Sequence, residues 1–146
     1  MEAVGYLLKN AQQALRAAMD TALRGLGITT PQYTALTFLD ESPGLSSAQL
    51  ARRAFVTPQT MNRIVANLEA AGLIARGPHP ELGRVLQASL TPQGRKLLTE
   101  CHRRAQQVES QMVADLTPAE RQQLAGLLQR CADALRPPRQ ESRRTA

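Results

Sequence analysis

The sequence predicts a mainly α-helical protein with a small β-hairpin wing and a long helix at each end of the chain. In the middle, residues 46–91 give a short helical stretch, a tight turn, an amphipathic helical stretch and two short segments of alternating hydrophobicity. On either side, residues 4–24 and 92–135 carry apolar side chains at helical spacing. The central order is that of a winged helix-turn-helix. We therefore expect a winged helix-turn-helix flanked by N- and C-terminal dimerisation helices.

The starts of the helices are marked locally. A first helix over residues 4–24 ends at Gly25 and Gly27. The next helix is expected from Thr30 to just before Ser42, and a short one over residues 47–53. A threonine side chain can cap a free backbone N–H at the start of a helix, and proline fits the first helical position. Four Thr-Pro pairs precede stretches of helical periodicity: Thr30-Pro31, Thr57-Pro58, Thr91-Pro92 and Thr117-Pro118. Two further pairs have the capping-box spacing: Ser46 with Gln49, and Thr117 with Glu120.

The helix expected over residues 58–71 has two different faces. One face is apolar and predicts a core contact: Met61, Ile64, Val65 and Leu68. The opposite face and its flanks are polar: Gln59, Thr60, Asn62, Arg63 and Asn67. A merely solvated face would more often alternate Glu and Lys, whereas these side chains suit base edges and phosphates. This helix is therefore predicted to read DNA.

A hairpin is expected after this helix. Residues 73–76 and 85–90 alternate as short strands, and the loop 77–84 between them contains two prolines and two glycines that make it project. Arg84, where the loop re-enters the strand, is placed to reach a minor groove. With the helix-turn-helix, the hairpin completes a set of candidate DNA contacts: Ser46, Ser47, Thr57, Gln59, Thr60, Asn62, Arg63, Asn67, Arg76 and Arg84.

The end helices predict a homodimer. A long helix over residues 92–116 and a last helix ending at Leu135 each carry an apolar stripe that a small winged helix cannot cover alone. We expect a single domain over residues 1–136, with dimerisation helices at 4–30 and 92–136 and the DNA-binding region at 31–91. The residues expected at the dimer contact are Leu7, Leu8, Val108, Met112, Leu116, Leu124 and Leu128.

Composition and charge agree with one compact domain. The chain has 146 residues, 42% of them hydrophobic and only 3% aromatic, so the core must be aliphatic. Of the net charge of +6, residues 46–91 hold five arginines against two glutamates, and residues 136–146 hold four arginines against one glutamate. Each segment therefore carries +3. This distribution suits phosphate binding, although the basic tail, residues 137–146, is equally well explained as a solvated, disordered end.

No secretory signal and no apolar run near the roughly eighteen residues of a membrane span occur in the chain, so we expect a cytoplasmic protein without a membrane partner. Cys101 and Cys131 form no CxxC pair, and neither a disulfide framework, a metal site nor a cofactor is expected. Both cysteines lie on apolar stripes and are expected to be small buried hydrophobes with raised pKa values. Arg103 and Arg104 beside Cys101 leave a redox switch open as an alternative.

The chain resembles the MarR family of bacterial regulators over essentially its whole length. The resemblance rests on three segments: Gly44-Leu45-Ser46-Ser47-Ala48-Gln49-Leu50-Ala51, then Thr57-Pro58-Gln59-Thr60-Met61-Asn62-Arg63 leading to Leu68-Glu69-Ala70-Ala71-Gly72-Leu73-Ile74, then Arg84 followed by Leu90-Thr91-Pro92-Gln93-Gly94. It implies dimeric repressors or activators whose DNA affinity changes when a small molecule binds or a thiol oxidises. It places Arg63 on the recognition-helix arginine and Arg84 on the wing arginine.

The chain departs from the family pattern at three places. Leu82 stands where an aspartate commonly orients the wing arginine, which leaves Glu81 as a possible replacement. Ala66 and Asn67 replace a common Asp-Arg pair, and no cysteine lies near the start of the first helix, where peroxide-sensing relatives keep theirs. The resemblance therefore favours a small aromatic, phenolic or apolar acid as effector, held near Arg16, Met19, Tyr33 and Phe38. Arg16 could instead pair with Asp20.

An enzyme is not expected, because the sequence has no paired-carboxylate spacing, no phosphate loop and no nucleophile with recognisable surroundings. The sequence predicts a homodimeric repressor that leaves an inverted-repeat operator on duplex DNA when its effector binds. Two alternatives stay open: a regulator controlled by thiol oxidation, and a winged helix that contacts proteins without specific DNA binding.

Overall fold

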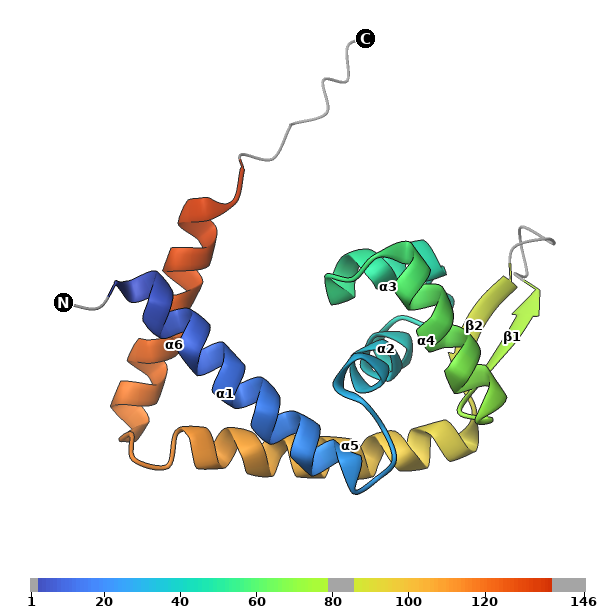
Figure 1. Ribbon diagram of the computed structural model, residues 1–146, viewed down its shortest axis with the longest axis horizontal. Helices are drawn as coiled ribbons and strands as arrows, with labels where there is room; N and C mark the ends of the chain where they lie inside the picture. Colours follow the sequence, from blue (N-terminus) through green and yellow to red (C-terminus); the bar gives the residue numbers. More distant parts are fainter. Residues whose placement is uncertain (1–2, 79–85, 138–146) are drawn as a thin grey trace, which may run out of the picture. The chain divides into compact units, whose positions relative to one another are not determined.

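The computed structural model describes residues 3–78 and 86–137. Their helices and strands follow in the order α1 (Val4–Arg24), α2 (Thr30–Glu41), α3 (Ser47–Ala54), α4 (Pro58–Ala70), β1 (Ile74–Pro78), β2 (Leu86–Leu90), α5 (Pro92–Met112) and α6 (Pro118–Leu135) (Figure 1). The chain forms two compact units, residues 1–109 and 110–146. The first unit holds the helix-turn-helix and the hairpin, and the second holds α6. The predicted winged-helix fold class is confirmed.

Most helices begin at the predicted caps, but α2 does not. The side chains of Ser46, Thr57 and Thr117 each accept from the backbone N–H three residues on, as expected. For α2 the cap is Thr29, whose hydroxyl accepts from Gln32 N at 3.3 Å while the Gln32 side chain accepts from Thr29 N at 3.0 Å. The Thr30 hydroxyl instead donates to Asp20 of α1. A reciprocal capping box at Thr29 therefore replaces the predicted cap at Thr30.

The turn between α3 and α4 is made by a left-handed residue that is not glycine. Phe55 has φ 56° and is 96% exposed. Because a side chain in this region of φ is uncommon, the tight α3–α4 turn fixes the backbone here against its local preference. α4 ends at Ala70, and Gly72, which follows its C-cap, has φ 73° and is suited to that conformation.

The hairpin is longer at its first strand than predicted. β1 pairs with β2 in antiparallel register, with Ile74 opposite Leu90 and Pro78 opposite Leu86. The predicted first strand ended at Arg76, whereas pairing continues to Pro78 because β2 supplies partners up to Leu86. The base of the hairpin is tied to α5 by Thr91, whose hydroxyl donates to Gly72 O at 2.7 Å and accepts from Gly94 N at 3.1 Å.

The core of the first unit is aliphatic, as its composition predicts. Its largest fully buried side chains come from every helix of this unit and from β1: Leu23, Leu36, Leu39, Leu50, Met61, Leu68, Ile74, Val65 and Cys101. On α5, Leu98, Cys101, Ala105 and Val108 are buried, and Leu97 only packs against the edge of the core. α5 ends at Met112 instead of Leu116, because short-range turns at Ala114 and Leu116 break the helical ladder.

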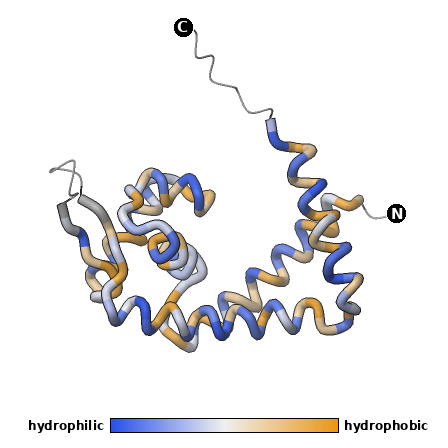
Figure 2. The backbone as a smooth tube through the Cα atoms, turned by 180° about the vertical axis from the view of Figure 1, so that it is seen from behind, coloured by the Kyte–Doolittle hydropathy of each residue, from blue (hydrophilic) through white to orange (hydrophobic). Residues whose placement is uncertain are grey.

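Large apolar side chains stay exposed on both end helices. On α1 they are Val4, Tyr6, Leu7 and Leu8, and on α6 they are Leu124, Leu127, Leu128 and Leu135. Figure 2 shows apolar residues recurring along each of these helices. α6 has no buried residue at all, so Cys131 is exposed and the expectation of a buried thiol there is wrong for the single chain. Of the predicted dimer residues, Met112 is exposed, Leu116 is half-buried and Val108 is already buried within its own unit.

Candidate nucleic-acid interface

The candidate interface is the outer face of α4. Met61, Ile64, Val65 and Leu68 are buried against the rest of the helix-turn-helix. The five polar residues predicted to read DNA are all exposed on the same helix: Gln59, Thr60, Asn62, Arg63 and Asn67. Because the apolar face anchors α4 along its length, its outer face is a rigid row of amide, hydroxyl and guanidinium groups.

The hydroxyl side chains among the candidates form hydrogen bonds at the starts of helices. The Thr57 hydroxyl accepts from Thr60 N at 3.1 Å and donates to the Thr60 hydroxyl at 2.9 Å. The Ser46 hydroxyl accepts from Gln49 N at 3.2 Å, and Ser46 and Ser47 are both half-buried. These side chains set where α3 and α4 begin, so they position the outer face of α4 before any partner binds.

Of the two arginines predicted to contact DNA from the hairpin, Arg76 lies within the described residues and Arg84 does not. Arg76 lies on β1 and forms an ion pair with Glu69 of α4, with Nε 2.8 Å from the carboxylate oxygen. This pair ties the first strand to the end of the recognition helix. Arg84 and the neighbouring Glu81 lie outside the described residues.

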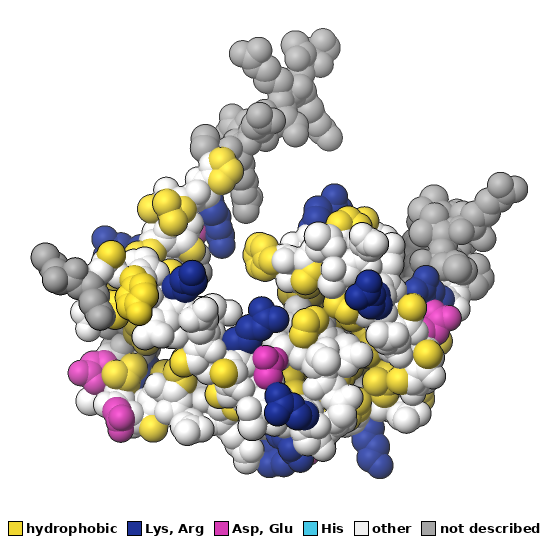
Figure 3. Space-filling view, viewed as in Figure 1, with side chains coloured by type: hydrophobic (Ala, Val, Ile, Leu, Met, Phe, Trp, Pro, Cys, Tyr) yellow, Lys and Arg dark blue, Asp and Glu magenta, His cyan; other side chains and the backbone are white. Residues whose placement is uncertain are grey.

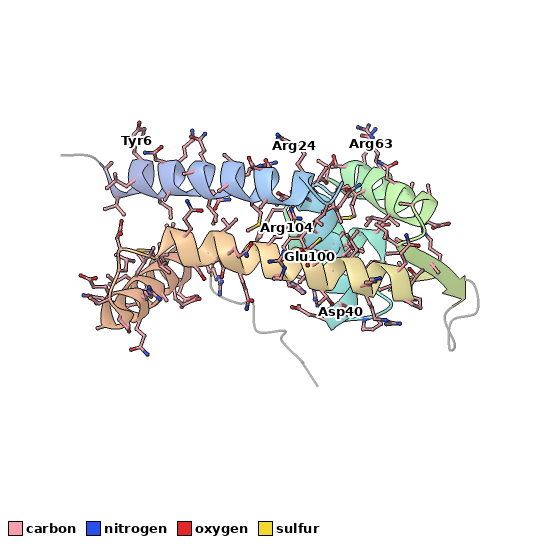
Figure 4. The ribbon with its side chains drawn as sticks, turned by 90° about the horizontal axis from the view of Figure 1, so that it is seen from below. Tyr6, Arg24, Asp40, Arg63, Glu100 and Arg104 are labelled. Carbon is pink, nitrogen blue, oxygen red and sulfur yellow. The ribbon has the colours of Figure 1, made fainter. Side chains whose placement is uncertain are left out.

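One residue that sequence reasoning missed is Arg24, at the end of α1. Arg24 and Arg16 of α1 line a groove of about 480 Å³ together with Arg63 of α4. In Figure 4, Arg24 and Arg63 point to the same side of the molecule. The spacing of eight residues between Arg16 and Arg24 puts them on neighbouring sides of one helix, but nothing in the sequence shows that α4 lies beside them.

The four candidate effector residues are not brought together. Arg16 and Met19 line a second cavity of about 380 Å³ between α1, the start of α2 and the α3–α4 turn. Tyr33 lies elsewhere, with its hydroxyl 2.7 Å from Nδ1 of His102 on α5. Phe38 lies beneath the Arg53 guanidinium, 5.8 Å from its ring centre. Of the four, Arg16 and Met19 therefore line one cavity, together with Leu15 and Phe55.

Comparison with known proteins decides the family. The MarR family model matches residues 26–84. The HTH-type transcriptional repressor Rv2887 of Mycobacterium tuberculosis is 39% identical over 127 residues, which are 87% of this chain and 91% of that protein. The chain belongs to the MarR family. Its predicted membership is confirmed, and with it the class of winged-helix transcriptional regulators.

Solved structures of MarR-family proteins agree with this placement. The crystal structure of Rv2887 in complex with DNA has a TM-score of 0.76 and 36% identity, and the match covers 90% of this chain and 98% of that one. The structure of Rv2887 in complex with salicylic acid has a TM-score of 0.76 and 38% identity, covering 90% and 97%. A protein of this family thus has solved complexes with both classes of partner predicted for this chain.

The thiol of Cys101 is poorly suited to oxidation in this MarR-family chain. Its side chain is fully buried, and burial followed by the nearby Glu100 carboxylate raises its pKa, against a smaller opposing effect of Arg104. The thiolate is the reactive form, so a raised pKa keeps this sulfur protonated.

Within residues 3–78 and 86–137, no group of three or more His, Cys, Asp or Glu side chains could hold a metal ion. None of the described helices has both the length and the apolar character of a membrane span.

Proposed function

We propose that this MarR-family protein is a homodimeric repressor that binds an inverted-repeat operator and is released by a small aromatic or apolar acid. The observation that carries the proposal is the outer face of α4, on which all five polar candidates are exposed above a buried apolar face. An α-helix fits the major groove, where Asn and Gln pair with adenine and Arg pairs with guanine. The DNA complex of Rv2887 supports the same use of this fold.

The dimer is supported by apolar surface that the single chain leaves uncovered. Leu7 and Leu8 of α1 are about half exposed, and so are Leu124 and Leu128 of α6. A row of exposed leucines on each end helix costs free energy in water, and burial against a second copy removes that cost. Two copies related by a two-fold axis present two α4 helices, so half-sites about one DNA turn apart, in inverted orientation, follow from the symmetry.

The effector site we propose is the cavity that Arg16 and Met19 share. Its walls are mostly apolar, from Leu15, Met19, Pro31 and Phe55, and Arg16 supplies the positive charge. An aromatic acid matches this combination, because its ring covers the apolar wall while its carboxylate pairs with a guanidinium. Relatives support the ligand class, since Rv2887 has been crystallised with salicylic acid and with p-aminosalicylic acid.

DNA recognition is tested by titrating the protein against its own upstream intergenic DNA and a scrambled duplex of equal length, at near-physiological salt. We expect tight, salt-sensitive binding to the first duplex with two protomers per site. Arg63→Ala should reduce the preference for the operator by about 1–3 kcal/mol. The matched control is Arg130→Ala on α6, which removes the same charge and should leave the preference unchanged. Equal weak binding to both duplexes contradicts the proposal and favours a protein-contact module.

The effector is tested with salicylate as the probe. We expect salicylate to raise the melting temperature of the free protein and to weaken operator binding, and Arg16→Ala to abolish both effects. If no small acid changes the melting temperature and Arg16→Ala leaves release unchanged, the cavity is not the effector site. The thiol alternative is tested with a variant in which both cysteines are replaced. If peroxide abolishes DNA binding of the wild type and of this variant alike, the cysteines are not a redox switch.

A further inference from the structure

We infer that α1 contributes to the DNA interface, and that the groove lined by Arg16, Arg24 and Arg63 binds the phosphate backbone beside the operator's major groove. This inference rests on the proposed function, since it adds a contact to the same DNA complex. It assigns a positioning role to an arginine of a helix that is otherwise expected to serve dimerisation. Figure 3 shows the face concerned, on which basic side chains lie over α1 and α4.

The first argument is the charge of the groove. It is lined by three arginines and a single carboxylate, Asp20, so its formal charge is +2. Asp20 accepts a hydrogen bond from the Thr30 hydroxyl, and no ion pair of the described residues joins it to either neighbouring arginine. Arg16 therefore does not form the ion pair with Asp20 that the sequence left open.

The second argument is that the three arginines of the groove have no carboxylate partner, unlike four other arginines of the described residues. Arg76 is paired with Glu69, Arg103 and Arg104 are paired with Glu100, and Arg136 is paired with Asp133. Arg16, Arg24 and Arg63 are exposed and have no ion pair among residues 3–78 and 86–137. Guanidinium groups gathered from two helices without carboxylate partners create a positive potential that an anion lowers.

The third argument is geometric. An α-helix with its side chains is about 10–12 Å across and the major groove is about 12 Å wide, so α4 fills the groove by itself. An element whose exposed side chains border the outer face of α4 is then placed to reach the sugar-phosphate backbone at the edge of the groove. α1 is such an element, because Arg16 and Arg24 line one groove with Thr60, Arg63 and Asn67 of α4.

The rest of the lining suits phosphate oxygens. Beside the arginines, the groove is lined by the uncharged polar side chains of Thr29, Gln32, Thr60 and Asn67. Hydroxyl, amide and guanidinium groups make most of the contacts to DNA phosphates, which position a protein without reading sequence. Arg24, on the α1 side of the groove, is therefore assigned to the phosphate backbone and holds the register of α4 on the duplex, while Arg63, on the α4 side, borders the groove and reads bases.

The test measures how operator affinity depends on salt for the full chain and for Arg24→Gln. Because two protomers bind each operator, the variant loses two phosphate contacts per complex, and the slope of log K against log salt should become shallower by about 1.8. Between 50 and 200 mM salt, the variant should then lose about 12-fold less affinity than the wild type. Its affinity for operator and scrambled duplexes should fall by the same factor, so the preference between them stays unchanged. Arg24→Lys should keep the wild-type slope, and Arg130→Gln on α6 is the matched control for charge.

Each other outcome has a separate meaning. If the wild type binds the operator and Arg24→Gln keeps the wild-type slope, the inference is overturned while the proposed function stands. If Arg24→Gln keeps the slope but loses the thermal shift caused by salicylate, the groove binds a small carboxylate and the phosphate assignment is wrong. A wild type that binds neither duplex overturns the proposed function, and this inference with it. An unchanged melting temperature of Arg24→Gln without ligand shows that folding is not the cause of any loss.

Discussion

Replacing Gly94 by alanine should destabilise the protein, although it adds a better helix former to α5. A Cβ at Gly94 would lie 2.0 Å from the carbonyl oxygen of Leu73 and 3.0 Å from its carbonyl carbon. These are backbone atoms and cannot rotate away, so the two segments must separate by at least about 1 Å. The same carbonyl oxygen accepts from Thr91 N at 3.0 Å, and that bond lies in the path of the movement.

The magnitude follows from three opposing contributions. Overpacking of this kind costs about 1–3 kcal/mol. Stretching one backbone hydrogen bond costs about 0.5–1.5 kcal/mol. Removing a glycine from a helix contributes about 1 kcal/mol in the other direction. We therefore expect Gly94→Ala to lower the free energy of unfolding by about 0.5–3.5 kcal/mol.

The assay is urea denaturation at a fixed protein concentration, because dimerisation makes stability depend on concentration. The matched control is Gly126→Ala, a glycine within α6 whose Cβ would meet nothing within 4 Å. At about 100° per residue, Gly126 lies about 200° from Leu124, so the control leaves the exposed leucine row alone. It should gain up to about 1 kcal/mol. If Gly94→Ala and Gly126→Ala stabilise the protein equally, the close contact between Gly94 and the Leu73 carbonyl is absent and the reasoning is refuted.

Three further outcomes are expected. Thr57→Ala should cost about 1 kcal/mol in urea denaturation, because it removes the N-cap of α4, and Thr57→Ser should not; equal stability of all three proteins contradicts the capping role. In a Cys131→Ser background, Cys101 should stay unreactive towards a thiol reagent until the protein unfolds, and rapid labelling of the native protein contradicts its burial. The pKa of Glu100 should be about 2 by NMR titration, because hydrogen bonds from Arg103 and Arg104 stabilise its carboxylate. Since this pKa is depressed, the stabilisation is complete above the ordinary value of 4.5 and is lost as pH falls towards 2; Glu100→Gln should remove that acid dependence.

The sequence predicts well those features whose partners lie within one helical turn. The outer and inner faces of α4 follow from periodicity, and the cap of Ser46 follows from Gln49 three residues on. At the start of α2, two threonines compete for the cap. Thr29 takes that role because Thr30 is engaged by Asp20, ten residues earlier on another helix. A local rule cannot weigh that tertiary contact, and this is why the sequence predicts the cap one residue too late.

The effector residues show the same limit over a longer distance. The resemblance to the family suggested Tyr33 and Phe38 together with Arg16, but each aromatic ring is held by a residue that the pattern does not reveal. The partner of Tyr33 is His102, which is 69 residues away in the sequence. Only the fold separates Arg16 and Met19 from these rings and places Phe55 beside them instead.

Arg16 links the two proposals, because it lines both the effector cavity and the groove assigned to DNA. A carboxylate bound to Arg16 withdraws one cation from the groove, so effector and operator must oppose each other through a shared side chain. Linkage then requires that saturating operator DNA weaken salicylate binding by the same factor by which salicylate weakens operator binding. Arg16→Gln should bring both factors close to 1, whereas Arg24→Gln should leave salicylate affinity for the free protein unchanged. Unequal factors in the wild type, measured by calorimetry in both orders of addition, contradict an equilibrium mechanism of release. Equal factors that survive in Arg16→Gln show that the coupling runs through another part of the fold.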